Sequence, residues 1–133
     1  MIDRYSRPAM KRVWSDENKY QKWLQVELAV CEAWAEEGAI PQDDLAGLRQ
    51  AKYDHQRMQE IFQTTRHDVT AFLSSVTEGL GPEGRWLHLG LTSSDMLDTA
   101  LGLQLTEAAG LLLQDLDEAI QAVRVQALQH KDT

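Results

Sequence analysis

The sequence predicts an all-α fold, with a small N-terminal helical domain at residues 1–92 and one long bundle-forming helix over residues 93–133. Apolar residues recur every three or four positions in five segments of the chain, as expected for helices with one buried face. Residues that begin or end helices stand at the borders of these segments, and no strand pattern or internal repeat is evident. The short apolar run at 86–91 could be extended, although Gly90 weakens that interpretation.

The first expected helix begins at Ser15 or Asp16, because both residue types cap helices, and it ends at Gly38. Its apolar residues form one row that would face a core: Tyr20, Leu24, Leu28, Cys31 and Ala35, widened by Trp23, Val30 and Trp34. This row predicts that the helix is a central element of the small domain.

Three shorter helices are expected next. One starts near Pro41, since proline suits a first helical turn. Asp54 is expected to cap another, and a third runs from about Asp68 to Glu78 and stops at Gly79. The turn-forming sequence LGPEGR at 80–85 then leads to the long helix.

The long helix follows the sequence TSSD at 92–95. Its apolar residues repeat at spacings of four, four and three: Leu97, Leu101, Leu105, Ala108, Leu112, Leu116, Ala119, Val123 and Ala127. This period of about 3.67 residues per turn is close to that of a straight helix. At about 1.5 Å per residue the rod would be roughly 58 Å long, more than four short helices can cover. We therefore expect it to pack against other long helices, and expect the chain to be a fragment of a larger protein.

The composition excludes several classes of protein. A formal net charge of −8 argues against nucleic acid or an anionic membrane as a partner. No long apolar run predicts a membrane span, and the polar N-terminus does not resemble a signal peptide. Cys31 is the only cysteine, which fits a reducing compartment such as the cytoplasm, and its place in the apolar row predicts a buried, inert thiol.

Charge is nevertheless unevenly placed. Four basic residues stand in the first twelve positions against one acidic residue, and two of them, Arg4 and Arg7, lie close to Tyr5. Guanidinium groups bind phosphate or carboxylate oxygens with paired hydrogen bonds, and a tyrosine hydroxyl adds a directed one. Two interpretations stay open at this point: a small-anion pocket, or a solvated N-terminal tail.

A second cluster is the sequence TTRHDV at 64–69. Arg66, His67 and Asp68 place a cation, an imidazole and a carboxylate in consecutive positions, which could contact a polar ligand or move a proton. Equally, Arg66 could end one helix and Asp68 begin the next, as the helix dipoles prefer. A metal site is not expected, because the other histidines show no ligand spacing and there is no second cysteine.

The third cluster opens the long helix. Thr92 and Asp95 have the spacing of a capping box, with aspartate in place of the usual glutamate. A helix N-terminus also offers free N–H groups and a positive dipole end, so hydroxyls beside it can bind a carboxylate. Gly90 would let a ligand approach the backbone closely. The two roles are compatible.

Four stretches together resemble the adenylosuccinate lyases of the fumarase/aspartase superfamily: RYSRP at 4–8, KWLQVELAVCEAWAEEGAIP at 22–41, TRHDV at 65–69 and HLGLTSSDMLDTA at 88–100. The resemblance covers essentially the whole chain in order. It implies an all-α enzyme whose central domain is a bundle of very long helices pooled by four subunits, with each active site built from three of them. The implied reaction eliminates fumarate from adenylosuccinate, giving AMP, or from succinyl-aminoimidazole carboxamide ribotide in purine biosynthesis, with no cofactor, in the cytoplasm.

The resemblance also implies roles for particular residues. Arg4 and Tyr5 would bind the nucleotide, chiefly its phosphate. Arg66, His67 and Asp68 would line the same pocket, with His67 near the reacting portion of the substrate as a possible auxiliary to catalysis. Thr92 and Ser93 would hold a succinyl carboxylate. His88 matches a histidine near the phosphate.

The general acid and base of these lyases match no position in this sequence, so the 133 residues alone are expected to be inactive. Two other interpretations remain. The chain could belong to another superfamily member, such as a carboxymuconate cycloisomerase, which would share Thr92 and Ser93 but need no phosphate site at Arg4 and Tyr5. It could instead be a non-catalytic module whose long helix only mediates oligomerisation.

Overall fold

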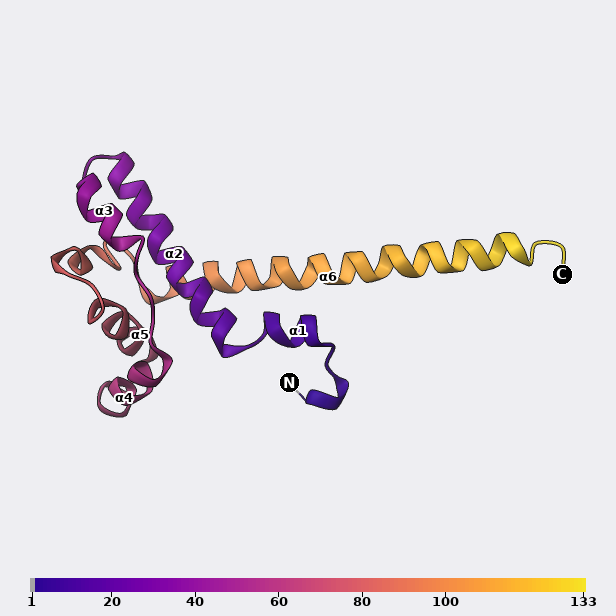
Figure 1. The fold of residues 1–133 in the computed structure, drawn as a ribbon, viewed down its shortest axis with the longest axis horizontal. Helices are drawn as coiled ribbons and strands as arrows, with labels where there is room; N and C mark the ends of the chain where they lie inside the picture. The colour runs from indigo at the N-terminus through magenta and orange to yellow at the C-terminus, as the bar shows by residue number, and fades with distance from the viewer. Residues whose placement is uncertain (1) are drawn as a thin grey trace.

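The computed structural model of the chain describes residues 2–133, apart from the side chain of residue 3. Over that range the fold is helical throughout, without a strand, so the predicted all-α class is confirmed (Figure 1). The elements in chain order are η1 (Asp3–Tyr5), α1 (Pro8–Val13), α2 (Asp16–Glu36), α3 (Gln42–Leu48), α4 (His55–Thr65), α5 (Asp68–Thr77), η2 (Pro82–Trp86) and α6 (Ser93–Gln129). Helices α2 to α5 and η2 gather at one end of α6, α1 lies beside the rod, and the other end of α6 projects alone.

The predicted helix borders agree with the structure because the capping residues act locally. The Ser15 hydroxyl accepts a hydrogen bond from the Asn18 N–H at 3.2 Å and starts α2. Gly38, with φ +77°, turns the chain after the last residue of that helix. Asp54 starts α4 in the same way as Ser15, accepting from the Arg57 N–H at 3.0 Å. Pro41 precedes α3 with a φ of −62°.

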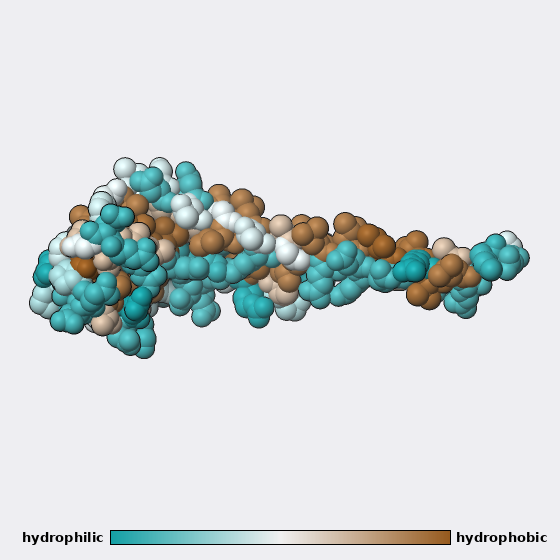
Figure 2. Space-filling model, turned by 90° about the horizontal axis from the view of Figure 1, so that it is seen from above, coloured by the Kyte–Doolittle hydropathy of each residue, from teal (hydrophilic) through white to brown (hydrophobic). Residues whose placement is uncertain are grey.

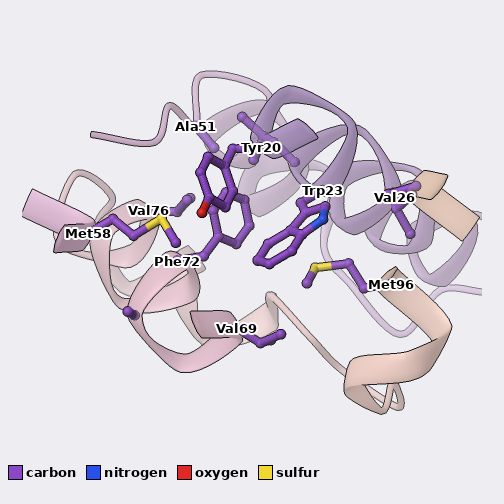
Figure 3. Packing of buried hydrophobic residues seen from close by; sticks show 12 residues of the cluster. Tyr20, Trp23, Val26, Ala51, Met58, Val69, Phe72, Val76 and Met96 are labelled. Atoms are coloured by element: carbon purple, nitrogen blue, oxygen red, sulfur yellow. The ribbon is translucent and has the colours of Figure 1, made fainter. Parts of the chain in front are cut away.

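A cluster of interlocking aromatic rings forms the main core (Figure 3). Trp23 of α2 meets Tyr20 and Phe72 edge-to-face, at centroid distances of 5.0 and 5.3 Å. Met96 from the first turn of α6 closes the cluster and is fully buried. The core thus joins α2, α5 and the start of α6, and truncation of Phe72 to alanine is expected to cost about 3–5 kcal/mol. A smaller cluster, which includes Cys31 and Leu48, joins α2 to α3.

The buried face of α6 differs from the predicted one. Its buried residues are Met96, Ala100, Gln104 and Ala108, whereas the predicted apolar row includes Leu101 and Leu105, which are about half exposed. The two rows are offset by one residue as far as Gln104 and share Ala108. Leu101 and Leu105 are therefore not covered by this chain's own helices, and the packing of the leucine row against other long helices stays a prediction.

The N-terminal segment forms α1, a helix that the sequence did not predict. The structure anchors it to α6 through polar contacts, with the Gln104 amide donating to the Val13 carbonyl at 2.7 Å. Lys22 of α2 pairs with Glu107, and Arg7 at the start of α1 pairs with Asp115. The segment consequently lies along the middle of α6 rather than extending freely into solvent (Figure 1).

From Leu112 onward, α6 keeps a set of large apolar side chains exposed to solvent: Leu112, Leu113, Leu116, Ile120, Val123, Val125 and Leu128. Figure 2 shows apolar surface running along the rod beside hydrophilic surface. None of the helices in residues 2–133 combines the length and apolar content needed to cross a membrane.

Candidate functional site

The start of α6 is a capping box. The backbone N–H of Thr92 donates to the Asp95 carboxylate at 2.8 Å, and the Asp95 N–H faces the Thr92 hydroxyl in the looser, reciprocal contact. The hydrogen bonds from the Thr92 backbone and side chain lower the pKa of Asp95. The predicted cap is confirmed, and it leaves the first N–H groups of a long helix directed to the space in front of it.

Ser93 occupies the first helical position and is only partly buried. Within residues 2–133, its hydroxyl has no hydrogen-bond partner, so it contributes nothing to the cap itself. Ser94 is more exposed, and it too lacks a side-chain partner in the described chain. A free hydroxyl at the positive end of a 37-residue helix has the chemistry of an anion site.

The segment before this cap is a series of turns, so the extended conformation considered for 86–91 is wrong. His88 and Gly90 both adopt left-handed backbone conformations, with φ +65° and +77°. Three turns in succession cannot continue a strand, and they bring the backbone close to α2. A Cβ at position 90 would lie 3.4 Å from the Trp34 ring, an ordinary contact, so the positive φ rather than a lack of space favours glycine here.

One face of α2 holds this segment in place. Glu27, Cys31 and Trp34 follow helical spacing and therefore point in similar directions. Trp34 Nε1 donates to the Leu89 carbonyl at 3.0 Å, and the Cys31 thiol lies 3.7 Å from the Trp86 carbonyl. Helices α2 and α6 are both fixed in the main core. Helix α2 therefore sets the position of the residues that lead into Thr92.

Glu27 makes the most direct of these contacts. Its carboxylate is buried, with 1% of the side chain exposed, and binds His88 twice. The His88 backbone N–H donates to Oε2 at 2.7 Å, and Nδ1 of the ring lies 2.6 Å from Oε1. Sequence reasoning missed Glu27, although its position four residues from buried Trp23 and from buried Cys31 was a usable sign of burial.

The Arg66-His67-Asp68 cluster lies in the turn between α4 and α5. Arg66 ends α4 in a left-handed conformation with φ 51°, and His67 caps α5 by accepting the Thr70 N–H on Nδ1 at 3.3 Å. Asp68 accepts the Val69 N–H at 2.8 Å. The helix-junction interpretation is therefore correct structurally, while the exposed charged groups remain available to a ligand.

Arg4 and Tyr5 lie in η1, remote from the other candidates. The Arg4 guanidinium stacks over the Tyr5 ring at 4.6 Å, and Tyr5 is 72% exposed. A cavity of about 190 Å³ beside Tyr5 is lined by Leu111 and Leu112 of α6. The residues from Thr92 to Leu111 span about 28 Å of helix at 1.5 Å each, so one chain does not bring the two groups into one pocket.

The α4–α5 turn is closer to the start of α6. Val69, one residue after the turn, belongs to the same buried cluster as Met96 in the first turn of α6 (Figure 3). His88, Thr92 and Ser93 are grouped by the chain itself, and the pKa of Asp95 is lowered in small part by His88. The structure thus gives two separated groups: Arg4 with Tyr5, and the residues around the start of α6.

An open groove of about 810 Å³ lies between α2 and α6. Its walls are mainly apolar and include Val30, Trp34 and Leu103, with Gly90 and Asp95 at one side. Thr92, Ser93 and His88 do not line it, and it lacks a basic residue among the described lining. The groove therefore does not suit an anionic substrate. Across the described positions, no three His, Cys, Asp or Glu side chains gather in a way that could hold a metal ion.

Comparison with known proteins decides the family. Residues 3–133 match the family model described as "Lyase". The chain belongs to this lyase family. It is 49% identical to adenylosuccinate lyase of Bacillus subtilis (strain 168) and 54% identical to adenylosuccinate lyase of Synechocystis sp. (strain ATCC 27184 / PCC 6803 / Kazusa). Both alignments cover 100% of this chain, which spans 31% of the length of those curated relatives.

Solved structures agree on the fold. A fumarate lyase from Mesorhizobium sp. BNC1 superposes with a TM-score of 0.83 at 24% identity, over 92% of this chain and 30% of that one. A 3-carboxy-cis,cis-muconate lactonizing enzyme from Pseudomonas putida gives a TM-score of 0.82 at 29% identity, over 94% of this chain and 30% of that one. The arrangement of a small helical unit on a long helix is thus shared by lyases whose names state different substrates.

Proposed function

We propose that this chain is the nucleotide- and carboxylate-binding part of an adenylosuccinate lyase, with the domain border at 92/93. The observation that carries the proposal is the identity of 49–54% over the whole chain to proteins of that name. The muconate-lactonizing enzyme is less similar, at 29%. The exposed Arg4 and Tyr5 add a phosphate-binding chemistry that a nucleotide substrate requires and a muconate does not.

The proposed reaction is a β-elimination. A base removes the proton from the carbon beside a succinyl carboxylate, the bond from the adjacent carbon to the purine amino nitrogen breaks, and that nitrogen takes a proton from an acid. AMP and fumarate result. Negative charge builds on the carboxylate as the first proton leaves, so the N-terminus of α6 and the free Ser93 hydroxyl would stabilise it most in the transition state. Thr92 would add its hydroxyl to the same carboxylate.

The remaining candidates would bind the rest of the substrate. Arg4 and Tyr5 would hold the phosphate, while Arg66, His67 and Asp68 would contact the nucleotide near the reacting bond. The same groups would serve succinyl-aminoimidazole carboxamide ribotide, which carries the same phosphate and succinyl groups. In this proposal the general acid and base lie outside these 133 residues, and no cofactor takes part.

Assembly follows from the separation of the two residue groups. A substrate that contacts both would need Arg4 and Tyr5 from one copy and Thr92 and Ser93 from another, because about 28 Å of helix separates them within one chain. The exposed apolar face of α6 supports the same conclusion, since a set of seven large apolar side chains requires a partner surface. We therefore infer an oligomer in which α6 joins a bundle of long helices. The resemblance to adenylosuccinate lyases implies that this oligomer is a cytoplasmic homotetramer.

The test uses the full-length protein and measures conversion of adenylosuccinate to AMP and fumarate by chromatography. Arg4→Gln is expected to raise KM for adenylosuccinate at least tenfold while the assembly persists. Arg49→Gln is the matched control, because Arg49 is an exposed arginine paired with Glu32. Conversion of a carboxymuconate to its lactone, without cleavage of adenylosuccinate, by the wild-type protein would favour the cycloisomerase instead. Absence of turnover of either would favour an oligomerisation module.

A further inference from the structure

The buried pair of Glu27 and His88 is not explained by stability alone. Glu27 is a charged residue in the middle of α2 with 1% of its side chain exposed, and burial of a carboxylate is costly unless it is fully paired. An apolar side chain of similar size would fill the same space between Trp23 and Cys31 without that cost. We therefore attribute the presence of a carboxylate at position 27 to its interaction with His88.

Glu27 controls His88 at two points. Its Oε2 accepts the His88 backbone N–H at 2.7 Å, which holds a non-glycine residue at φ +65°. Its Oε1 lies 2.6 Å from ring Nδ1. The backbone and the ring are thus fixed by the same carboxylate, so neither the position nor the plane of the imidazole is free to change.

The contact also decides which ring nitrogen is available. A carboxylate can only accept, so Nδ1 carries the proton in this hydrogen bond. Nε2 is then the nitrogen left over, and within the described chain it has no partner. The His88 side chain is 23% exposed, so one edge of the ring reaches solvent while the other faces Glu27. When Nε2 is also protonated, the buried carboxylate compensates the charge and Nε2–H can donate to an anion.

We propose that Glu27 is a positioning residue, which holds the proton on His88 Nδ1 and presents Nε2 to an anionic group of the substrate. This inference rests on the proposed function, because it assumes that the substrate is bound beside the start of α6. Two anionic groups are candidates, the phosphate and a succinyl carboxylate. The charged groups that face His88 are Glu27 from α2 and Asp95 from α6.

The experiment compares wild-type, Glu27→Gln, His88→Gln and the double variant in the full-length protein. The glutamine amide can accept the His88 N–H through its oxygen, but its NH₂ group then faces Nδ1, so the ring is neutral with its proton on Nε2. The variant thus removes the negative partner that compensates an imidazolium, and Nε2–H donates to the anion without a positive charge. We expect the inhibition constant of AMP or of fumarate to rise about tenfold in Glu27→Gln. If the inhibition constant rises for AMP alone, His88 binds the phosphate. If it rises for fumarate alone, His88 binds the carboxylate. Glu32→Gln is the control, since Glu32 is a carboxylate of the same helix that pairs with Arg49.

The double variant distinguishes a purely structural role of Glu27 from a role in positioning His88. If Glu27 acts through His88, Glu27→Gln in the His88→Gln background should not raise either inhibition constant further. An equal rise in both backgrounds would overturn the proposal, as would unchanged inhibition constants in Glu27→Gln. Wild-type turnover of adenylosuccinate is measured first, so a failure of the proposed function is seen separately.

A direct observation avoids dependence on the folding of any variant. Nitrogen-15 solid-state NMR of the unliganded wild-type protein, with labelled histidine, reports which ring nitrogens are protonated. The His88 signals, assigned by their loss in His88→Gln, should show a protonated Nδ1 in a strong hydrogen bond. An unprotonated Nδ1 in the wild-type protein would overturn the proposal whether or not Glu27→Gln folds.

Discussion

Removal of the Ser93 hydroxyl is expected to separate ligand binding from helix capping at the start of α6. Among the described residues, this hydroxyl has no hydrogen-bond partner, so Ser93→Ala removes no internal contact. If it binds a succinyl carboxylate, the variant loses one charge-assisted hydrogen bond, worth about 1.5–3 kcal/mol. At about 1.4 kcal/mol per factor of ten, kcat/KM should fall roughly ten- to a hundredfold.

The structure provides two matched comparisons. Ser94→Ala removes a neighbouring exposed hydroxyl that also lacks an internal partner, and it should leave both turnover and stability unchanged. Thr92→Ala removes a member of the capping box and should cost about 1 kcal/mol of folding stability in addition to activity.

Steady-state kinetics with adenylosuccinate and thermal melting of the full-length protein measure the two effects independently. The expected pattern is a loss of turnover without a shift in melting temperature for Ser93→Ala, and a loss of both for Thr92→Ala. If Ser93→Ala melts earlier yet turns over normally, Ser93 belongs to the cap and the carboxylate role is wrong.

Three further outcomes are expected. Polar replacements at Leu112, Leu116 and Val123, each more than half exposed, should reduce self-association of the chain, as measured by sedimentation. Burial of such a side chain at an interface contributes about 1.5–3 kcal/mol. Unchanged association would place the interface elsewhere. Burial raises the pKa of the Cys31 thiol to about 11, so it should resist a thiol reagent at pH 8 until the protein unfolds, and rapid labelling of the folded protein would contradict its burial. The hydrogen bonds from Thr92 lower the pKa of Asp95, so the contribution of Asp95 to stability is present above the ordinary pKa of an aspartate and is lost as the pH falls through the lowered pKa. Asp95→Asn should therefore destabilise the protein at pH 7 and have the same stability as the wild type at low pH.

The sequence predicted the helices well where the controlling interactions are local. Ser15, Gly38, Asp54 and Thr92 act on backbone groups within a few residues, so their effect can be inferred without knowledge of the tertiary structure. Helix α1 was missed because six residues carry too little apolar periodicity, and its position depends on Gln104, ninety-one residues away. The conformation of residues 86–91 was ambiguous because it depends on contacts with α2, which lies far away in the sequence, rather than on the segment's own apolar pattern.

The candidate site was predicted only in part. The three clusters do lie at exposed turns and helix ends, where a ligand can reach them. The sequence did not show, however, that Tyr5, which follows Arg4, lies beside Leu111 and Leu112 of α6, far from Thr92. Glu27 was overlooked because its partner, His88, lies sixty-one residues later. Their pairing becomes visible only when α2 and the 86–91 segment are seen together. The buried residues Met96 and Gln104 of α6 were not part of the leucine row, because periodicity identifies an apolar face without saying which neighbour covers it.

The contrast between the two halves of α6 has a consequence for biosynthesis. The described buried residues of this helix end at Ala108, so every residue that contributes to the core has left the ribosome once Ala108 has done so. The small helical unit can therefore fold first, during translation. In the proposed oligomer, the later, apolar half of the helix is buried only when partner copies are present, so its burial depends on their concentration. Folding of one chain and assembly of several are separate kinetic steps, and scarcity of subunits would delay only the second.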